Sequence, residues 1–330
     1  MSTKRVLVCG GLNCAESLWS THRGFLLDGH EVAYVPTSEI VALIKQARAG
    51  AIDDLLKLME TKPDLVVWWQ PQNDANAVLL EAMRAASPNT VMVMQSIDDP
   101  YVFDSAAAQR VFPCFDYAVT CARCSVPWYE ARGVKPIVGY PACDAVLHGK
   151  AVPTESERCA FNFVATNTYR RSLYPQVLAG REQMVRGVAA CGRVNLYGWA
   201  INCKDLNGSV VARGFVPYDA HPGIYAASKI TLRSHVRPDA EGYLNERTIS
   251  AMASGACVLC DRVAGITEIF QEGEEIVLWS TLDELKEKAA WLVAHDAARQ
   301  QIGQKARAAV FGVHDNVTLA RRIIEAACAS

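Results

Sequence analysis

The clearest chemical signal in the sequence is a short helix whose first turn suits a phosphate group. Residues 241–261 read E-G-Y-L-N-E-R-T-I-S-A-M-A-S-G-A-C-V-L-C-D, which predicts a loop, an amphipathic helix, a glycine stop and a buried strand. Asn245 is a favourable N-cap, and Gly255 suits a left-handed C-terminal residue. Free N–H groups and the helix dipole favour an anion there, and Arg247 adds a planar charged fork. The phosphate-binding candidates are Glu241, Gly242, Asn245, Glu246, Arg247 and Thr248. The alternative is an ordinary capped helix with a solvated first turn.

A pair of carboxylates is the second feature that suits chemistry. Asp98 and Asp99 follow the apolar run at 91–95, which predicts a strand. In parallel sheets ligands bind beyond the carboxyl ends of the strands, and a carboxylate there can act as a general base. Either aspartate is therefore a candidate catalytic base. The alternative is that one of them only caps the next helix; His22 and His30 are other candidate bases.

Two further polar or glycine-rich strand ends belong to the same predicted edge. Gly10, Gly11 and Asn13 follow the first strand, and Gln70 follows the strand at 65–70. The run C-G-G-L-N-C does not match G-x-G-x-x-G, and no acidic residue clearly ends a second strand, so nicotinamide binding is not expected. We expect these four residues to face a sugar or an acceptor, or the glycines only to turn the chain tightly.

Strands and helices alternate along the chain, which predicts parallel α/β sheets. The order in the first half is strand 5–9, helix 15–27, strand 31–35, helices 39–49 and 53–61, strand 65–70, helix 75–86, strand 91–95, helix 106–111, strand 117–120, helix 126–132 and strand 137–140. The second half continues with strand 160–164, helix 173–191, strands 194–197 and 210–216, a helical region at 217–227, strand 229–235, the opening helix, strands 256–260 and 276–279, and helices 282–295, 297–310 and 316–329. The polar stretch at 141–157 is predicted to be an interdomain linker.

Composition limits the classes of protein that fit. The chain has 330 residues, 51% hydrophobic and 21% charged, which suits two globular domains better than one. The formal net charge of −2 provides no global attraction for nucleic acid or an anionic membrane. No apolar run is long enough to span a membrane, and the first residues indicate a strand rather than a signal peptide. We therefore expect a cytoplasmic protein.

The cysteines are expected to be reduced core residues. Among the twelve cysteines, two pairs have C-x-x-C spacing: Cys121 with Cys124, and Cys257 with Cys260. Residues i and i+3 of a strand point to opposite faces, which argues against a shared metal for Cys257 and Cys260. Cys121 and Cys124 lie at a strand-to-helix turn, where a redox role is the alternative to packing.

Four motifs of the second half resemble a known family. S-K-I-T-L (228–232), Y-L-N-E-R-T (243–248), A-M-A-S-G (251–255) and G-I-T-E-I-F-Q-E-G-E-E-I-V-L-W (265–279) are similar to the CgeB-like, spore-maturation type of group-one glycosyltransferase, which has the GT-B fold. The resemblance is clear from about residue 161 onward and weak before it. It implies two Rossmann-like doubly wound domains that face a cleft, with a last helix that crosses back to the first domain.

The resemblance also assigns roles to domains and residues. It implies an acceptor domain at 1–152, a nucleotide-sugar donor domain at 153–314 and a returning C-terminal helix at 315–330. Further donor-binding candidates by position are Asn167, Arg170, Gly198, Trp199, Lys229 and Ser250. Ser250 is a departure, since the family commonly has a glutamate there that is thought to hold the donor ribose. Glu246, one helical turn earlier, would be a substitute.

The implied reaction is glycosyl transfer from a nucleotide-diphosphate sugar, for which we expect a UDP-sugar, to an unknown acceptor hydroxyl. No cofactor or metal is expected, because the helix dipole and arginine would stabilise the leaving diphosphate. Inversion or retention, the acceptor and the oligomeric state stay open. Three alternatives are a sugar-nucleotide epimerase of the same fold, a non-catalytic nucleotide-sugar-binding relative, and a nucleic-acid-modifying transferase that uses Arg170, Arg171 and Arg237.

Overall fold

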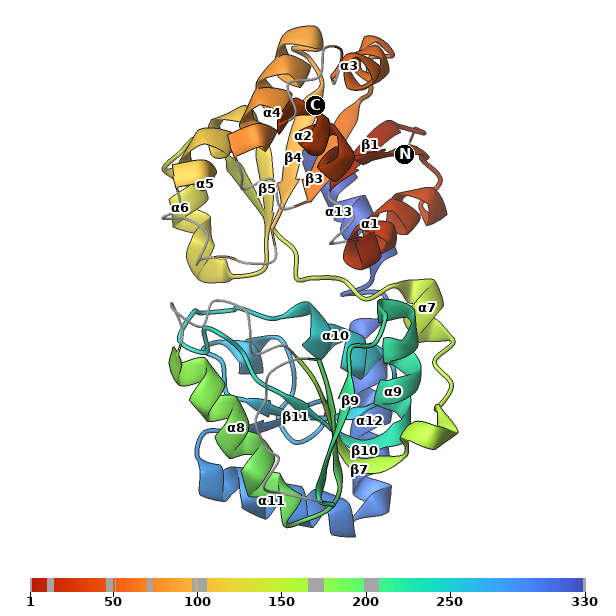
Figure 1. The fold of residues 1–330 in the computed structure, drawn as a ribbon, viewed down its shortest axis with the longest axis vertical. Helices are drawn as coiled ribbons and strands as arrows, with labels where there is room; N and C mark the ends of the chain where they lie inside the picture. Colours follow the sequence, from red (N-terminus) through yellow and green to blue (C-terminus); the bar gives the residue numbers. More distant parts are fainter. Residues whose placement is uncertain are drawn as a thin grey trace. The chain divides into compact units, whose positions relative to one another are not determined.

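The chain forms two compact α/β units, each built on one parallel sheet. The computed structural model describes residues 2–10, 15–45, 50, 52–69, 74–96, 99, 106–165, 175–198 and 208–328. The first unit comprises Met1–Asp144 and His314–Ser330, and the second comprises Ala145–Val313. Each unit contains a sheet of six parallel strands with helices packed on it (Figure 1). The two α/β sheets predicted from the alternation of strands and helices are therefore confirmed.

In the first unit the strand order is β2-β1-β3-β4-β5-β6. The chain enters at β1 in the middle, moves outward to β2, and returns through β3 to the other edge, which is the doubly wound arrangement. The strands are β1 (Arg5–Gly10), β2 (Glu31–Pro36), β3 (Leu65–Trp69), β4 (Val91–Gln95), β5 (Tyr117–Thr120) and β6 (Lys135–Val138). The helices are α1 (Ala15–Leu27), α2 (Thr37–Lys45), α3 (Asp53–Glu60), α4 (Asp74–Ala86), α5 (Ala106–Val111), α6 (Val126–Glu130) and α13 (Asn316–Cys328).

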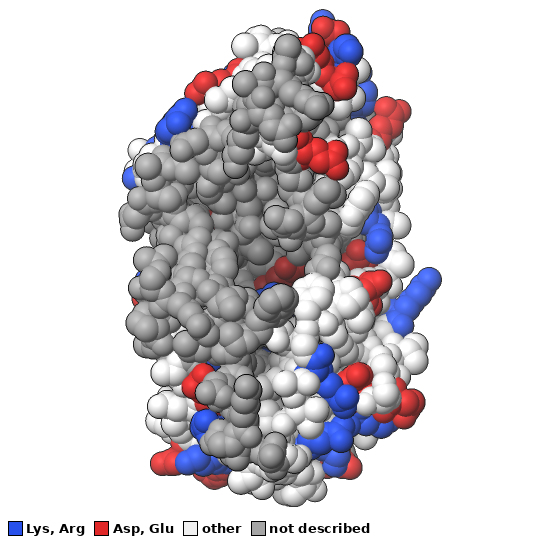
Figure 2. Space-filling model, in the orientation of Figure 1, with Lys and Arg blue, Asp and Glu red and all other residues white. Residues whose placement is uncertain are grey.

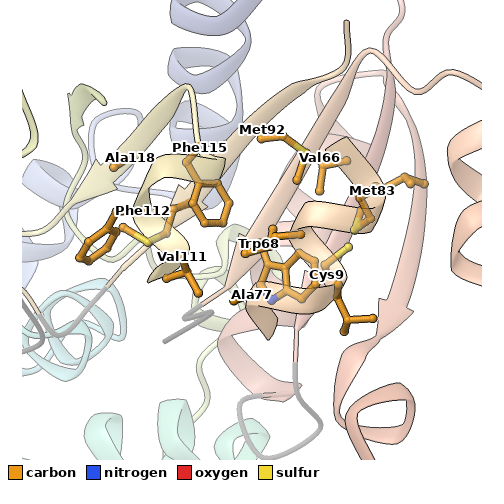
Figure 3. Close-up of a cluster of buried hydrophobic side chains, with 14 of the residues drawn as sticks. Cys9, Val66, Trp68, Ala77, Met83, Met92, Val111, Phe112, Phe115 and Ala118 are labelled. Atoms are coloured by element: carbon orange, nitrogen blue, oxygen red, sulfur yellow. The ribbon is translucent and has the colours of Figure 1, made fainter. Parts of the chain in front are cut away.

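Strand β3 shows why this sheet is covered on both faces. All five of its residues are buried, and side chains alternate along a strand. Val66 and Trp68 enter one core, with residues of α3 to α6 (Figure 3). Leu65, Val67 and Trp69 enter a second core, on the face that α1 and α13 cover.

The last helix, α13, is part of the first unit although it follows the second unit in sequence. Its apolar residues Leu319, Ile323 and Ile324 pack in the same core as the inner strands of the first sheet. At its start the Asn316 Nδ2 donates to the backbone oxygen of Ser20 at 2.8 Å, which fixes α13 against α1. The last helix thus packs on the first domain, as the resemblance implied.

In the second unit the strand order is β12-β11-β10-β7-β8-β9. Here too the first strand of the unit lies inside the sheet, so the topology is again doubly wound. The strands are β7 (Cys159–Val164), β8 (Val194–Tyr197), β9 (Val210–Gly214), β10 (Ser228–Arg233), β11 (Cys257–Asp261) and β12 (Val277–Trp279). The helices are α7 (Ala145–Gly149), α8 (Pro175–Ala189), α9 (His221–Ala227), α10 (Glu246–Ala253), α11 (Leu282–Ala294) and α12 (Asp296–Val310).

The segment predicted to be a linker contains helix α7, which belongs to the second unit. His148 of α7 is fully buried, and its backbone oxygen accepts from Arg307 of α12 at 3.1 Å. The same guanidinium donates to Gly149 O and to Ala253 O of α10, each at 2.6 Å. These tertiary hydrogen bonds explain why the units divide after Asp144, whereas the composition of the stretch places the boundary after Val152.

The described surface carries charges of both signs. On the face drawn in Figure 2, groups of Lys and Arg and groups of Asp and Glu both occur among uncharged residues, in keeping with the net charge of −2. Within the described residues, every helix is too short or too polar to cross a membrane.

Candidate functional site

Helix α10 begins with a side-chain cap, as the sequence predicts. The Asn245 Oδ1 accepts from the backbone N–H of Thr248 and from its hydroxyl, both at 3.0 Å. Asn245 has extended backbone angles, and Gly255 after the helix has a φ of +80°. The helix therefore starts and stops where local chemistry dictates. Its positive end lies beside the carboxyl end of β10, because the Asn245 amide is also within 3.4 Å of Arg233 Nη2.

Arg233, the last residue of β10, is the central unexplained charge of the second unit. Its side chain is fully buried, with 1% of the residue exposed. Nη1 donates to Val164 O at 2.9 Å and Nη2 reaches Asn245 Oδ1, but the buried Nε has no hydrogen-bond partner among the residues that the structure describes. Among the described residues, no carboxylate lies within ion-pair distance of it. Burial lowers the pKa of Arg233, so the fold holds this cation at a cost.

Two more arginines interact electrostatically with Arg233. Arg181 of α8 is buried, and its pKa is lowered to about 10, first by burial and then by the charges of Arg233 and Arg247. The guanidinium carbons of Arg181 and Arg233 each lie 5.9 Å from the ring centre of Phe163. Arg247, in the first turn of α10, is exposed. Three guanidinium groups from three elements thus interact electrostatically near the start of α10, and an anion with several oxygens would stabilise them. We call Arg181, Arg233 and Arg247 the arginine cluster.

A neutral histidine borders the arginine cluster. His221, at the start of α9, is buried between Tyr218 and Tyr225, with ring centres 5.5 and 5.9 Å away. Its pKa is lowered to about 3, first by burial and then by the charges of Arg247 and His148. The imidazole is therefore uncharged at neutral pH and adds no positive charge to the site.

This histidine makes the stability of the protein depend on pH. The pKa of His221 is about 3 when folded and 6.5 when exposed, so the unfolded chain binds the extra proton between these values. The contribution of the neutral His221 side chain to the free energy of unfolding is complete above pH 6.5. It falls as the pH drops toward 3, and at pH 5 it has fallen by about 2 kcal/mol. Between pH 7.5 and pH 5, we expect the free energy of unfolding, measured by urea titration, to fall by about 2 kcal/mol less in His221→Gln than in the parent protein. An identical loss in the two proteins would contradict this assignment.

Two of the predicted residues on α10 have informative environments. Glu246 accepts a hydrogen bond from the Tyr218 hydroxyl at 3.0 Å, which orients its carboxylate at the helix start. Ser250 is buried, and within the described part of the chain its hydroxyl has no hydrogen-bond partner. Glu246 is therefore better placed than Ser250 to meet a ligand hydroxyl. In the preceding loop Glu241 is exposed, and the N–H of Gly242 donates to Ala264 O at 2.8 Å.

Lys229 does not join the other candidates. It lies near the amino end of β10, where its Nζ is 3.2 Å from Asp296 Oδ1. Arg233 ends the same strand four residues later, which puts their Cα atoms about 13 Å apart. The family-based expectation that Lys229 binds donor is not supported by this position, because the ion pair and the opposite strand end account for the side chain.

The candidates of the first unit are only partly described. Gly10 ends β1 and is buried. Asp99 is fully buried, and the Tyr129 hydroxyl donates to its two carboxylate oxygens at 3.0 and 3.1 Å. Burial and the Asp99 charge raise the pKa of Tyr129 well above 10, so the hydroxyl stays protonated. This closed contact favours a packing role for Asp99 over that of a base. Asp98, Gly11, Asn13, Gln70, Asn167, Arg170 and Trp199 lie outside the described residues, whereas Gly198 follows the end of β8.

Arg181 and Arg233 are the residues that the sequence did not single out. A signal for Arg233 was present, since a charged residue directly ends the apolar strand S-K-I-T-L-R. The expectation instead named Arg237, which is bound to Asp239 at 2.7 Å. Arg181 lies in the middle of α8 among polar residues and carries no local signal.

Comparisons with known proteins agree with this fold. Residues 171–325, a little less than half of the chain, match the family model described as Glycosyl transferase-like. That match agrees with the coarser part of the resemblance, a group-one glycosyltransferase, and leaves the CgeB-like subtype a prediction. A comparison with curated proteins gives no match.

Solved structures show the same fold over the whole chain. Anabaena HepE, solved with UDP and glucose, has a TM-score of 0.68 and 15% identity, with 99% of this chain and 100% of that chain covered. Sucrose-phosphate synthase from Thermosynechococcus elongatus has a TM-score of 0.66 and 11% identity, with 99% and 100% covered. A glycosyltransferase from Rickettsia africae has a TM-score of 0.65 and 12% identity, with 99% and 98% covered. The fold is therefore that of the GT-B glycosyltransferases.

Proposed function

We propose that this chain transfers a sugar from a nucleoside-diphosphate donor, a UDP-sugar, to an acceptor hydroxyl. The observation that carries the proposal is the buried Arg233 with its unpartnered Nε, set beside the capped start of α10. A buried guanidinium without a carboxylate is destabilising unless an anion compensates it. The glycosyl transferase-like match over the same unit names the reaction class for which such an anion is the leaving group.

In this proposal the arginine cluster and the α10 dipole bind the diphosphate. Arg233 would contact a phosphate oxygen through Nε, and Arg247 would contribute from the exposed side. Charge that develops on the departing diphosphate is then stabilised by groups already in place, which is the main requirement for this kind of transfer. Glu246, oriented by Tyr218, would accept from a ribose hydroxyl in place of the glutamate that Ser250 replaces.

The choice of UDP among nucleotides comes from the relatives. Anabaena HepE, which shares the fold, was solved with UDP-glucose as well as with UDP. We extend the nucleotide, and not the sugar, to this chain. The first unit would bind the acceptor. If the reaction inverts the anomeric centre, Asp98 is the preferred base, since the Asp99 carboxylate already accepts a hydrogen bond from Tyr129.

A ligand panel tests the proposal. We expect UDP to raise the melting temperature most, UMP less and uridine least, because each successive ligand has one phosphate group fewer to bind to the arginine cluster. Incubation with UDP-glucose and other UDP-sugars should then release UDP only with an acceptor present. Equal shifts with UDP and uridine would contradict the diphosphate site. Donor consumed without any acceptor would favour the epimerase alternative, and binding without turnover the non-catalytic one.

Removal of Arg247 tests the exposed side of the cluster. Hydrogen bonds to charged groups contribute about 1.5–3 kcal/mol, and solvent exposure favours the lower figure. We expect Arg247→Ala to weaken UDP binding about tenfold without changing the melting temperature of the unliganded protein. The control is Arg262→Ala, which removes an exposed arginine bound to Glu272 at 2.7 Å and should leave UDP affinity unchanged. Calorimetric titration measures both, and unchanged UDP binding in Arg247→Ala would exclude Arg247 from the site.

A further inference from the structure

A second group of polar side chains lies buried behind the ends of β10 and β11. His235, Cys260 and Asp261 each present one metal-ligating atom, and all three atoms lie within 4.8 Å of one another. His235 Nδ1 is 2.7 Å from Asp261 Oδ1, and Cys260 Sγ is 3.7 Å from that nitrogen and 3.5 Å from that oxygen. All three residues are buried. From this geometry we propose that they supply three ligands to one zinc-type divalent cation.

Two of the three separations fit the edges of a tetrahedral site. With zinc–nitrogen and zinc–oxygen bonds of about 2.1 Å and a zinc–sulfur bond of about 2.3 Å, the sulfur edges would be about 3.5 Å. The two sulfur distances already have this length. Only the nitrogen–oxygen distance, now that of a hydrogen bond, has to open to about 3.4 Å. A cation that replaces the shared proton needs little movement of the strands.

The backbone holds the ligands in place before a metal binds. The N–H of His235 donates to the other carboxylate oxygen, Asp261 Oδ2, at 2.8 Å. Strands β10 and β11 are paired in register, with Arg233 opposite Cys260. The ring of Tyr243 packs edge-on against His235 at 5.6 Å. A ligand set oriented by outer hydrogen bonds in this way is the arrangement that metal sites use.

Charge and donor type favour zinc over calcium or magnesium. A thiolate and an imidazole are ligands for borderline metals, whereas calcium and magnesium prefer oxygen. The bound thiolate and carboxylate would together neutralise a divalent cation, which matters because Arg233 is within electrostatic range of both Cys260 and Asp261. The Asp261 carboxylate, moreover, has no Lys or Arg ion pair among the described residues.

This site differs from the cysteine pair that the spacing suggested. Cys257 packs in the core on the α8, α11 and α12 side of the sheet, whereas Cys260 meets His235 on the other face. The expectation that the two cysteines point to opposite faces agrees with this arrangement. Cys257 therefore offers a matched control, a buried cysteine on the same strand outside the proposed site.

Cobalt titration of the full chain, after a chelator has removed bound metal, tests the proposal. We expect one cobalt ion per chain, a thiolate-to-cobalt charge-transfer band, and loss of that band when zinc is added. Cys260→Ser should abolish the band, Asp261→Asn should weaken cobalt binding at least tenfold, and Cys257→Ser should leave both unchanged. Absence of the band in the parent, or a band of equal size in Cys260→Ser, would overturn the site. If Cys260→Ser does not fold, which circular dichroism would show, His235→Asn provides the same comparison with the thiol intact.

Discussion

Replacing Arg233 with methionine should weaken UDP binding about 100-fold and leave the unliganded protein at least as stable as the parent. Methionine has a similar length and no charge. The loss of affinity reflects about 3 kcal/mol, the upper range for hydrogen bonds to charged groups, because the Arg233 side chain is buried. The gain reflects the buried, poorly compensated guanidinium, whose replacement by an apolar side chain is commonly neutral or stabilising. Calorimetric titration with UDP and a thermal melt without it measure the two effects.

The opposite signs of these two effects separate a ligand-binding role from a structural one. If Arg233 served the fold, through its bonds to Val164 O and Asn245, the methionine variant would melt earlier than the parent. The control is Arg237→Met, which removes a nearby arginine bound to Asp239 and should change neither quantity. A destabilised Arg233→Met protein that still binds UDP normally would refute the proposed role of Arg233.

A single methyl group at Gly303 should destabilise the second unit by about 3 kcal/mol. A Cβ added to this residue of α12 would lie 2.4 Å from the backbone oxygen of Gly255, just after α10. The added Cβ is fixed to the backbone of α12 and would meet a backbone atom, so α12 and the segment after α10 have to move apart. Overpacking of this kind lowers the free energy of unfolding by about 1–3 kcal/mol or more. Since Arg307 of α12 also donates to Ala253 O, the shift would displace α10, whose start is the proposed phosphate site.

The measurement for Gly303→Ala is a thermal melt followed by UDP titration. We expect the melting temperature to fall by roughly 6–12 °C and UDP binding to weaken with it. Gly180→Ala is the matched control, because a Cβ at this position of α8 meets no atom within 4 Å. That variant should be more stable by about 0.5–1 kcal/mol. Equal melting of the Gly303→Ala variant and the parent would show that α10 and α12 are not held by close backbone contact.

Local chemistry explains why much of the fold and one half of the site could be predicted from sequence. The N-cap of α10 depends on Asn245 and Thr248, which are three residues apart, and the end of the helix depends on one glycine. The bounds of this helix can therefore be predicted from its own sequence. The buried strands, such as L-V-V-W-W at β3, are equally local signals. Helix α7 was missed because its stability comes from Arg307, which is far away in the sequence.

The other half of the site depends on burial, which is a property of the assembled unit. The sequence places Arg233 at the end of a strand, but only the packed fold shows that its guanidinium is buried and that both Arg233 and Arg181 lie against the ring of Phe163. Likewise His235, Cys260 and Asp261 come together because β10 and β11 end side by side. The position of Lys229 also depends on the assembled sheet. The family motif places Lys229 in a strand, but it does not show that the residue lies at the amino end of β10, away from the carboxyl end where Arg233 lies.

The most direct test of the account is a crystal structure of the protein with UDP. The account predicts that a phosphate oxygen accepts a hydrogen bond from Arg233 Nε, at about 2.7–2.9 Å, with the diphosphate at the start of α10. UDP bound elsewhere, or a diphosphate at α10 while Arg233 Nε remains without a partner, would contradict it.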